Sequence, residues 1–228
     1  MSADLEGKHV VVTGGHGGLG RAIVHRLARE GATCHVPVRR ADGAPADPPN
    51  IRTTAGVDLA DEDAVRAYYA DLPPVFASIH AAGGFAMKAA VDTSLDEFEA
   101  MHRKNAVTCF LCCREAIRTM QTSGGGRVVN VAARPAVAPV GGLVAYTASK
   151  AAVASMTQTL AHEARGDGIL VNAVLPSIID TPNNRSAMPQ ADHAAWPKPE
   201  QIAEAVAFLA SPRNELTWGA LVPVYGDS

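Results

Sequence analysis

Apolar residues in this chain alternate between short continuous runs and stretches with helical spacing. The run "KHVVVT" at 8–13 is apolar and β-branched, and after a cluster of glycines the stretch 20–31 carries apolar residues three and four apart. A continuous apolar run predicts a strand buried on both faces, whereas the second spacing predicts a helix. The chain therefore begins with a strand, a tight turn and a helix.

The same alternation continues to the end of the chain. Further strands are predicted for the runs "TCHVPV", "RTTAGVDL", "PVFASIHAAGG", "GGGRVVNVAA", "GILVNAVLP" and "GALVPVYG". Further helices are predicted at 61–71, 94–120, about 145–165 and 199–210. Ser94 and Glu97 form a capping box, and Pro199 stands where a helix would start. Because strands and helices alternate through short connections, we predict an α/β fold with a doubly wound parallel sheet, the Rossmann fold.

Composition is that of one globular domain over 1–228. The chain is 47% hydrophobic with a formal net charge of -3. No basic stripe offers a surface for nucleic acid or an anionic membrane, and no apolar segment approaches the ~20 residues that span a bilayer. The first residues lack a signal-peptide pattern, so we expect a cytoplasmic protein. The least regular segments are 42–50 and 183–198, and the second is expected to cover the substrate.

Four cysteines fit a reducing compartment: Cys34, Cys109, Cys112 and Cys113. The C-x-x-C pair of Cys109 and Cys112 has no second ligand pair nearby, so we interpret these residues as buried helix thiols and predict no metal.

The glycine cluster "TGGHGGLGR" can be read as G-x-G-x-x-G or as T-G-x-x-x-G-x-G. Both patterns need glycine because a backbone without Cβ turns sharply and approaches a pyrophosphate, which then lies at the start of the next helix. No Lys-Ser or Lys-Thr pair follows, so the turn is not a Walker A loop. The predicted nucleotide contacts at this turn are Gly14, His16, Gly17, Gly18, Leu19 and Gly20.

The residues after the second strand read the adenosine ribose in such folds. An acid there suits a free 2′-hydroxyl, and a base suits a 2′-phosphate. This chain has Arg39 and Arg40 in "VPVRR" and no carboxylate. The sequence therefore predicts NADP(H) as the cofactor, with NAD(H) as the alternative and the two arginines as solvated loop charges in that case.

Tyr146 and Lys150 lie four residues apart on a predicted helix and share one face. A phenol with a pKa near 10 is a weak acid, but a nearby ammonium favours the phenolate and lowers that pKa. The pair is suited to general acid catalysis.

Together with the glycine turn, this pair resembles the short-chain dehydrogenase/reductase family over essentially the whole chain. The matching pieces are "TGGHGGLG", "GVDL", "HAAGG", Asn105, "RVVNVAA", "YTASK", "ILVNAVLPS" and Thr181. The resemblance implies that Tyr146 donates the proton, that Lys150 binds the nicotinamide ribose and tunes the tyrosine, and that Asn105 holds a water for proton relay. It also implies cofactor contacts at Asp58, Leu59, Ala82, Gly83, Ile179 and Thr181.

The sequence departs from the family at the residue that polarises the substrate oxygen. The family's active-site serine falls thirteen residues before the tyrosine, where this chain has Ala133. Three explanations stay open. Tyr146 and Lys150 suffice for an already electrophilic imine or quinonoid; Arg134 or a water replaces the serine; or the protein binds cofactor without catalysis. Arg134 is thus a candidate substrate contact, with a surface arginine as its plain alternative.

The sequence as a whole predicts an NADP(H)-dependent oxidoreductase. It would transfer hydride to a small carbonyl, imine or quinonoid substrate, with Tyr146 as proton donor. The alternative is a non-catalytic dinucleotide-binding redox sensor on the same fold. Small residues along the helix at about 145–165 suit packing between subunits, as a homodimer or homotetramer.

Overall fold

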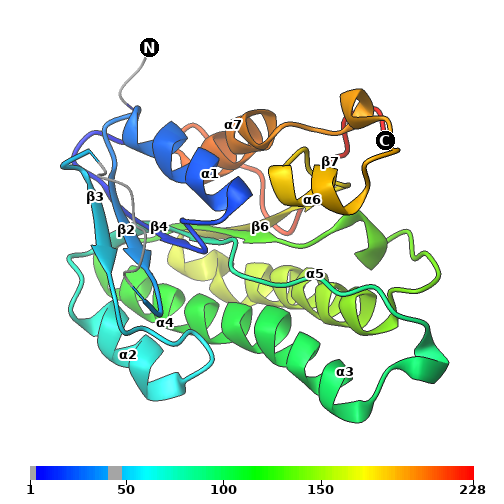
Figure 1. The fold of residues 1–228 in the computed structure, drawn as a ribbon. Helices are drawn as coiled ribbons and strands as arrows, with labels where there is room; N and C mark the ends of the chain where they lie inside the picture. Colours follow the sequence, from blue (N-terminus) through cyan, green and yellow to red (C-terminus); the bar gives the residue numbers. More distant parts are fainter. Residues whose placement is uncertain (1–3, 41–47) are drawn as a thin grey trace.

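The computed structural model describes residues 4–40 and 48–228, so most of the segment 42–50 lies outside the described residues. One seven-stranded sheet runs through the described part in the order β3-β2-β1-β4-β5-β6-β7, with every strand parallel to its neighbours (Figure 1). The strands are β1 (His9–Thr13), β2 (Thr33–Pro37), β3 (Ile51–Thr54), β4 (Val75–His80), β5 (Gly126–Val131), β6 (Ile169–Pro176) and β7 (Leu221–Val224). This is the predicted doubly wound sheet.

The strand order reverses between β1 and β4, which lie side by side at the centre of the sheet. At such a switch point the loops that leave the two strands run in opposite directions and leave a crevice at their carboxyl ends. The glycine turn after β1 and the loop after β4 border this crevice.

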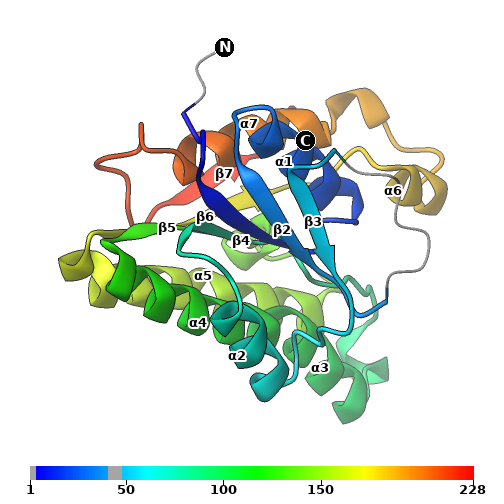
Figure 2. The same ribbon diagram turned by 90° about the vertical axis from the view of Figure 1, so that its left-hand side faces the viewer.

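Helices cover both faces of the sheet (Figures 1 and 2). One face carries α1 (Gly18–Ala28) and α7 (Pro199–Ala210), and the other carries α2 (Glu62–Ala70), α4 (Thr108–Ser123) and α5 (Val144–Ala164). Successive residues of β5 serve the two cores, because Val128 packs with the α4 and α5 side and Val129 with the α1 and α7 side. Burial on both faces explains why the strands read as continuous apolar runs.

Several boundaries differ from the sequence predictions. The helix expected at 94–120 consists of α3 (Leu95–His102), a π-helical turn at Arg103–Val107, and α4. The strand expected for "RTTAGVDL" ends at Thr54, since Gly56 turns the chain with a φ of 84°. The segment 183–198 is more regular than expected, because Pro182 starts the short helix α6 (Pro182–Ala187).

The capping box is present as predicted. Ser94 Oγ accepts from the Glu97 amide at 3.2 Å, and the Glu97 carboxylate accepts from the Ser94 amide at 2.8 Å. Across residues 4–40 and 48–228, every helix is too short or too polar to cross a bilayer.

Candidate active site

The glycine turn brings the chain close to the loop after β4. Gly14 has a φ of 68°, and a Cβ there would lie 2.7 Å from the amide nitrogen of Ala82. Thr13 holds the same neighbour, since its Oγ1 accepts from the Ala82 amide at 3.2 Å. Glycine is therefore required at 14 for its backbone angle and for the space that it leaves between the two loops.

The start of α1 is open to an anion. Gly17 is its N-cap, no described side chain caps it, and its first turn carries no acidic residue. Free N–H groups at a helix start, without a competing carboxylate, suit a phosphate. A Cβ at Gly18 would lie 2.9 Å from Thr181 Cγ2, so Thr181, one of the predicted cofactor contacts, lies directly against this turn. The cradle fits a pyrophosphate.

The predicted adenosine contacts lie around the carboxyl ends of β2 and β3. Arg39 and Arg40 follow β2 and are exposed. Leu59 is 9% exposed, whereas the Asp58 carboxylate accepts from the Ala60 amide at 3.0 Å and stabilises its own turn. His16 links the glycine turn to β3, with Nε2 at 3.2 Å from the Thr53 hydroxyl.

Tyr146 lies in the first turn of α5, against an aromatic ring that the sequence reasoning missed. Phe85 comes from the loop after β4, and its ring centroid lies 5.0 Å from that of Tyr146, at an interplanar angle of 73°. Burial raises the pKa of Tyr146 to about 12. The phenol is thus protonated at neutral pH, and the lowering that the sequence reasoning expected from Lys150 is absent from this arrangement.

Lys150 lies one turn further along α5 and is buried. Its Nζ donates to the Val131 carbonyl at the end of β5, at 2.7 Å. Burial lowers the pKa of Lys150 to about 8, and the nearby Cys109 opposes this lowering. The position of a Cβ at Gly83 would be 3.5 Å from this Nζ, so the amine also borders the loop after β4.

Asn105 occupies the π-helical turn and joins three segments. Its Oδ1 accepts from the Gly84 amide at 2.7 Å, and its Nδ2 donates to the Gly84 carbonyl at 3.1 Å and to Ser149 Oγ at 2.9 Å. Ser149 in turn donates to the Tyr146 carbonyl at 2.7 Å. The side chain of Asn105 therefore holds the loop after β4 against the turn that carries Tyr146 and Lys150.

Ala133 and Arg134 point to different surroundings. Ala133 follows β5 in extended conformation and is 4% exposed. Arg134 is exposed, and its guanidinium lies 5.1 Å from the ring centroid of Tyr225, near the end of the chain. The cation–π contact accounts for the position of Arg134 without a substrate.

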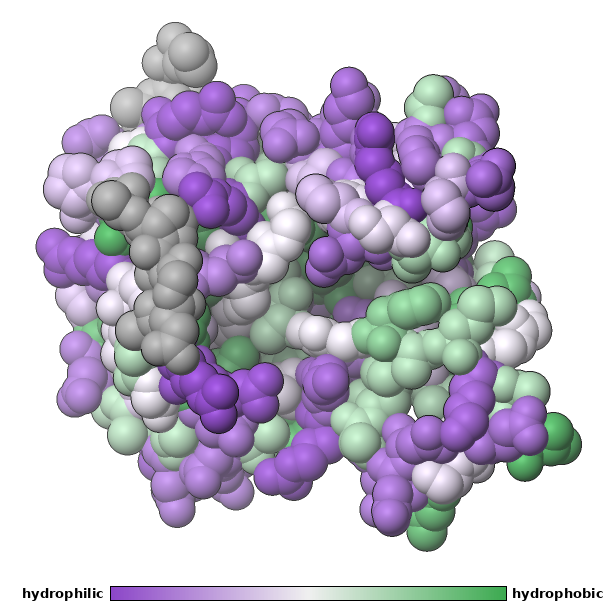
Figure 3. Space-filling model, viewed as in Figure 1, coloured by the Kyte–Doolittle hydropathy of each residue, from purple (hydrophilic) through white to green (hydrophobic). Residues whose placement is uncertain are grey.

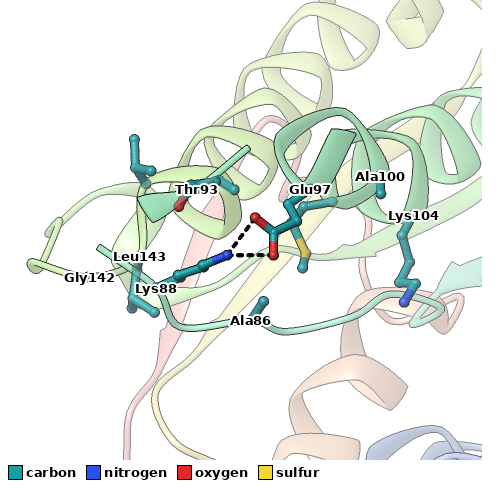
Figure 4. Close-up of a pocket in the computed structure, with 11 residues that line it drawn as sticks. Ala86, Lys88, Thr93, Glu97, Ala100, Lys104, Gly142 and Leu143 are labelled. Atoms are coloured by element: carbon teal, nitrogen blue, oxygen red, sulfur yellow. Dashed lines mark hydrogen bonds and ion pairs between the residues drawn. The ribbon is translucent and has the colours of Figure 1, made fainter. Parts of the chain in front are cut away.

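A hollow crosses the molecule between the helices on the two faces of the sheet, with apolar surface beside it (Figure 3). Exposed apolar side chains in the loop after β4, in the segment before α5 and at the first residue of α5 include Phe85, Met87, Val137, Val140 and Val144. A cavity of about 210 Å³ lies between the β4 loop, α3 and the start of α5. Lys88 and Glu97 both line this cavity and form an ion pair at 2.7 Å (Figure 4).

The segment expected to cover the substrate is anchored by its tryptophan. Trp196 is 6% exposed and its ring lies 4.6 Å from that of His193. This burial anchors the segment on the core. The Ile179 carbonyl accepts from Asn184 Nδ2 at 2.8 Å, which ties a residue four positions ahead of the segment to α6.

Comparisons with known proteins agree with this geometry. Residues 8–192 match the family model for short chain dehydrogenases. A 3beta-hydroxysteroid dehydrogenase of Mediterraneibacter gnavus is 32% identical over 186 residues, which cover 77% of this chain and 67% of the relative. The 3-oxoacyl-acyl-carrier-protein reductase MabA of Mycobacterium bovis is 31% identical over 231 residues, covering 96% of this chain and 92% of the relative.

A solved structure described as a short chain dehydrogenase/reductase family protein superposes with a TM-score of 0.90 at 32% identity, covering 98% of this chain and 97% of its own. The relatives are dehydrogenases and reductases, and members of their family bind nicotinamide dinucleotides. The chain belongs to the short-chain dehydrogenase/reductase family of oxidoreductases.

Proposed function

We propose that the protein is an NADP(H)-dependent oxidoreductase that reduces a small carbonyl, imine or quinonoid substrate, with Tyr146 as the proton donor. The observation that carries this proposal is the arrangement of Tyr146 and Lys150 on one face of α5, beside the loop that adjoins the glycine turn. A bound nicotinamide supplies the hydride in such a reaction.

The described residues have separate tasks. The turn at Gly14 and the start of α1 bind the pyrophosphate, and Arg39 and Arg40 favour a 2′-phosphate by charge. Tyr146 keeps its proton at neutral pH because burial raises its pKa to about 12. It gives up that proton when the substrate oxygen or nitrogen becomes basic.

Lys150 and Asn105 position the acid. The Lys150 amine is fixed between the Val131 carbonyl and the β4 loop, where it can reach a ribose hydroxyl. Asn105 maintains the spacing between that loop and α5 through Gly84 and Ser149. We assign Asn105 a positioning task, with a relay water as the further possibility that the family resemblance implies.

We also propose that Ala133 stands where the family has its active-site serine. A missing hydroxyl donor favours substrates that are already electrophilic, such as an imine or a quinonoid ring, over simple ketones. The named relatives act on a hydroxysteroid and a 3-oxoacyl group, so carbonyl compounds belong in the same test panel.

Tyr146→Phe is the direct test, because it removes the hydroxyl and keeps the ring against Phe85. We expect turnover of NADPH with the best panel substrate to fall by roughly 10²–10⁴-fold, with NADPH binding retained. Tyr68→Phe is the matched control, since its hydroxyl is buried without a hydrogen-bond partner among the described residues. Unchanged turnover in Tyr146→Phe would refute the role of Tyr146.

The competing function is a non-catalytic redox sensor, which the absence of a hydroxyl at Ala133 favours. Single-turnover mixing of the protein–NADPH complex with carbonyl, imine and quinonoid compounds separates the two. Oxidation of the nucleotide by any member supports the enzyme, and tight NADPH binding without any oxidation supports the sensor.

We further propose that the protein acts in the cytoplasm as a homodimer or homotetramer. Phe110 is 42% exposed on the outer side of α4, beside the long helix α5. Aromatic residues are enriched in contact surfaces between proteins relative to the rest of the surface. Light scattering on the purified protein measures the oligomeric state directly.

A further inference from the structure

Three groups that bind soft metal ions meet inside the core, on the side of the sheet that α4 covers (Figure 1). His80 ends β4, and Cys109 and Cys113 lie one turn apart on α4. Their ligand atoms all lie within 4.8 Å of one another. The residues are 3%, 5% and 0% exposed, respectively.

The separations suit a tetrahedral ion. Bonds of ~2.3 Å to sulfur and ~2.0 Å to nitrogen place two thiolates about 3.8 Å apart and a thiolate about 3.5 Å from an imidazole nitrogen. The Cys109 and Cys113 sulfurs are 3.9 Å apart, and Cys113 Sγ is 3.2 Å from His80 Nδ1. These two separations match the tetrahedral values to within a few tenths of an ångström, and the ligand atoms of Cys109 and His80 lie within 4.8 Å of each other.

An oxygen faces two of these three groups. Asn130 Oδ1, from β5, lies 2.8 Å from His80 Nδ1 and 3.3 Å from Cys113 Sγ. Its Nδ2 donates to Thr157 Oγ1 at 2.9 Å, which fixes the amide so that the oxygen points towards His80 and Cys113. This oxygen is available as a fourth ligand.

The histidine ring is held in the orientation that metal binding requires. His80 Nε2 lies 2.9 Å from Ser78 Oγ, which lies 2.8 Å from the Tyr69 hydroxyl. Because Asn130 Oδ1 can only accept, Nδ1 carries the ring proton in this arrangement and donates it to Asn130. Metal binding requires that the ring proton be carried by Nε2, which then donates to Ser78 and leaves the Nδ1 lone pair for the metal. Outer partners of this kind orient metal-bound histidines in general.

We propose that His80, Cys109 and Cys113 form a binding site for a thiophilic divalent cation of the Zn²⁺ type, with Asn130 Oδ1 as the fourth ligand. Binding breaks two S–H bonds, forms two metal–sulfur bonds and releases two protons, with no change of oxidation state. The two thiolates neutralise the charge of the ion, which is the condition for placing a dication in an apolar core.

The sequence analysis predicted no metal because it paired Cys109 with Cys112. On α4 these two residues point to different neighbours, since Cys112 interacts with Tyr69 and Cys109 lies beside Cys113 and His80. Cys109 and Cys113 are four residues apart and share a helix face, whereas Cys112 faces away from the cluster. The histidine comes from a strand 33 positions away from Cys113, which no local spacing could indicate.

Co²⁺ is a suitable probe, because tetrahedral thiolate coordination gives it strong visible and near-ultraviolet absorption that hydrated Co²⁺ lacks. The full-length protein is refolded from denaturant with Co²⁺ and reductant, so that the buried site is accessible, and excess ion is removed. We expect one Co²⁺ per chain, a tetrahedral spectrum, and loss of that spectrum when Zn²⁺ is added.

Cys109→Ser and Cys113→Ser should each lower the affinity for Co²⁺ at least tenfold and remove part of the sulfur charge-transfer absorption. Cys112→Ser is the matched control, because Cys112 is 1% exposed on the same helix and outside the cluster, and it should bind as the wild type does. Circular dichroism verifies that each variant is folded.

The wild-type measurement alone can overturn the proposal, whatever the variants do. Refolded wild-type protein without stoichiometric Co²⁺, or with only the weak spectrum of octahedral Co²⁺, would show that the cluster is a plain hydrogen-bond network. Equal loss of the spectrum in Cys112→Ser would place the ion elsewhere. The readout needs neither NADPH nor substrate, so it is independent of the proposed function.

Discussion

The pKa of Lys150 leads to a quantitative prediction about the pH dependence of NADPH use. Burial lowers this pKa from 10.5 to about 8, which corresponds to about 3 kcal/mol against the charged form. Below pH 8 the amine is an ammonium that donates to Val131 and can donate to a ribose. Above pH 8 it loses its charge, so kcat/KM for NADPH should fall tenfold per pH unit.

Lys150→Arg separates this titration from others, because a guanidinium stays charged up to pH ~12. We expect lower activity overall, since the larger group must fit beside Gly83, but no alkaline break near pH 8. Initial rates of NADPH oxidation at saturating second substrate, between about pH 6 and pH 10, give the free-enzyme profile. Lys104→Arg serves as the control, because Lys104 is an exposed lysine whose removal should leave the break in place.

Two results would refute this reasoning. A break near pH 8 that persists in Lys150→Arg belongs to another group. A wild-type profile that stays flat to pH 10 would mean that the bonds to Val131 and to the nucleotide do not need the ammonium.

Three further predictions concern the acceptor, the nucleotide and the positioning of the site. Ala133→Ser should raise kcat/KM for simple ketones by up to roughly 10²–10³-fold, and no gain would show that a hydroxyl donor is not limiting. The double substitution Arg39→Ala and Arg40→Ala should weaken NADPH binding by roughly 1.5–3 kcal/mol and leave NADH binding unchanged. The control Arg29→Ala should change the affinity for neither nucleotide. Calorimetric titration measures the two affinities, and equal losses for NADPH and NADH would contradict the assignment. Asn105→Ala leaves the Gly84 amide without its partner and should lower the free energy of unfolding in urea by roughly 1–3 kcal/mol; an unchanged unfolding midpoint would contradict the positioning task.

The fold could be predicted from the sequence because its strands are buried on both faces. Val10, Val11 and Val12 are all fully buried, with Val11 in one core and its neighbours in the other, so the strand reads as a continuous apolar run. The boundaries were less predictable. The π-helical turn before α4 has no local signal, because the apolar spacing continues through it.

Only those parts of the candidate site that belong to a sequence motif could be predicted. The glycine turn and the Tyr146–Lys150 spacing are visible in the sequence, and their roles remain predictions. The packing of Phe85 on Tyr146 was not visible, because it depends on the path of the β4 loop. The bond from Lys150 to Val131 was hidden for the same reason, since a backbone carbonyl carries no residue-specific signal.

One physical cause, the removal of water from the same crevice, sets the two pKa shifts and thereby the resting form of the pair of Tyr146 and Lys150. Burial disfavours the charged form of each group, the phenolate of Tyr146 and the ammonium of Lys150. It therefore raises the pKa of Tyr146 to about 12, further from neutrality, and lowers the pKa of Lys150 to about 8, closer to neutrality. At neutral pH the pair is therefore a protonated phenol beside a charged amine. That pair can give a proton to a substrate atom as it becomes basic, but the phenol is a poor base for removing a proton from an alcohol. At neutral pH the resting form of the pair is thus the one from which a reduction starts, whereas initial rates of oxidation should rise with pH as the phenolate of Tyr146 forms.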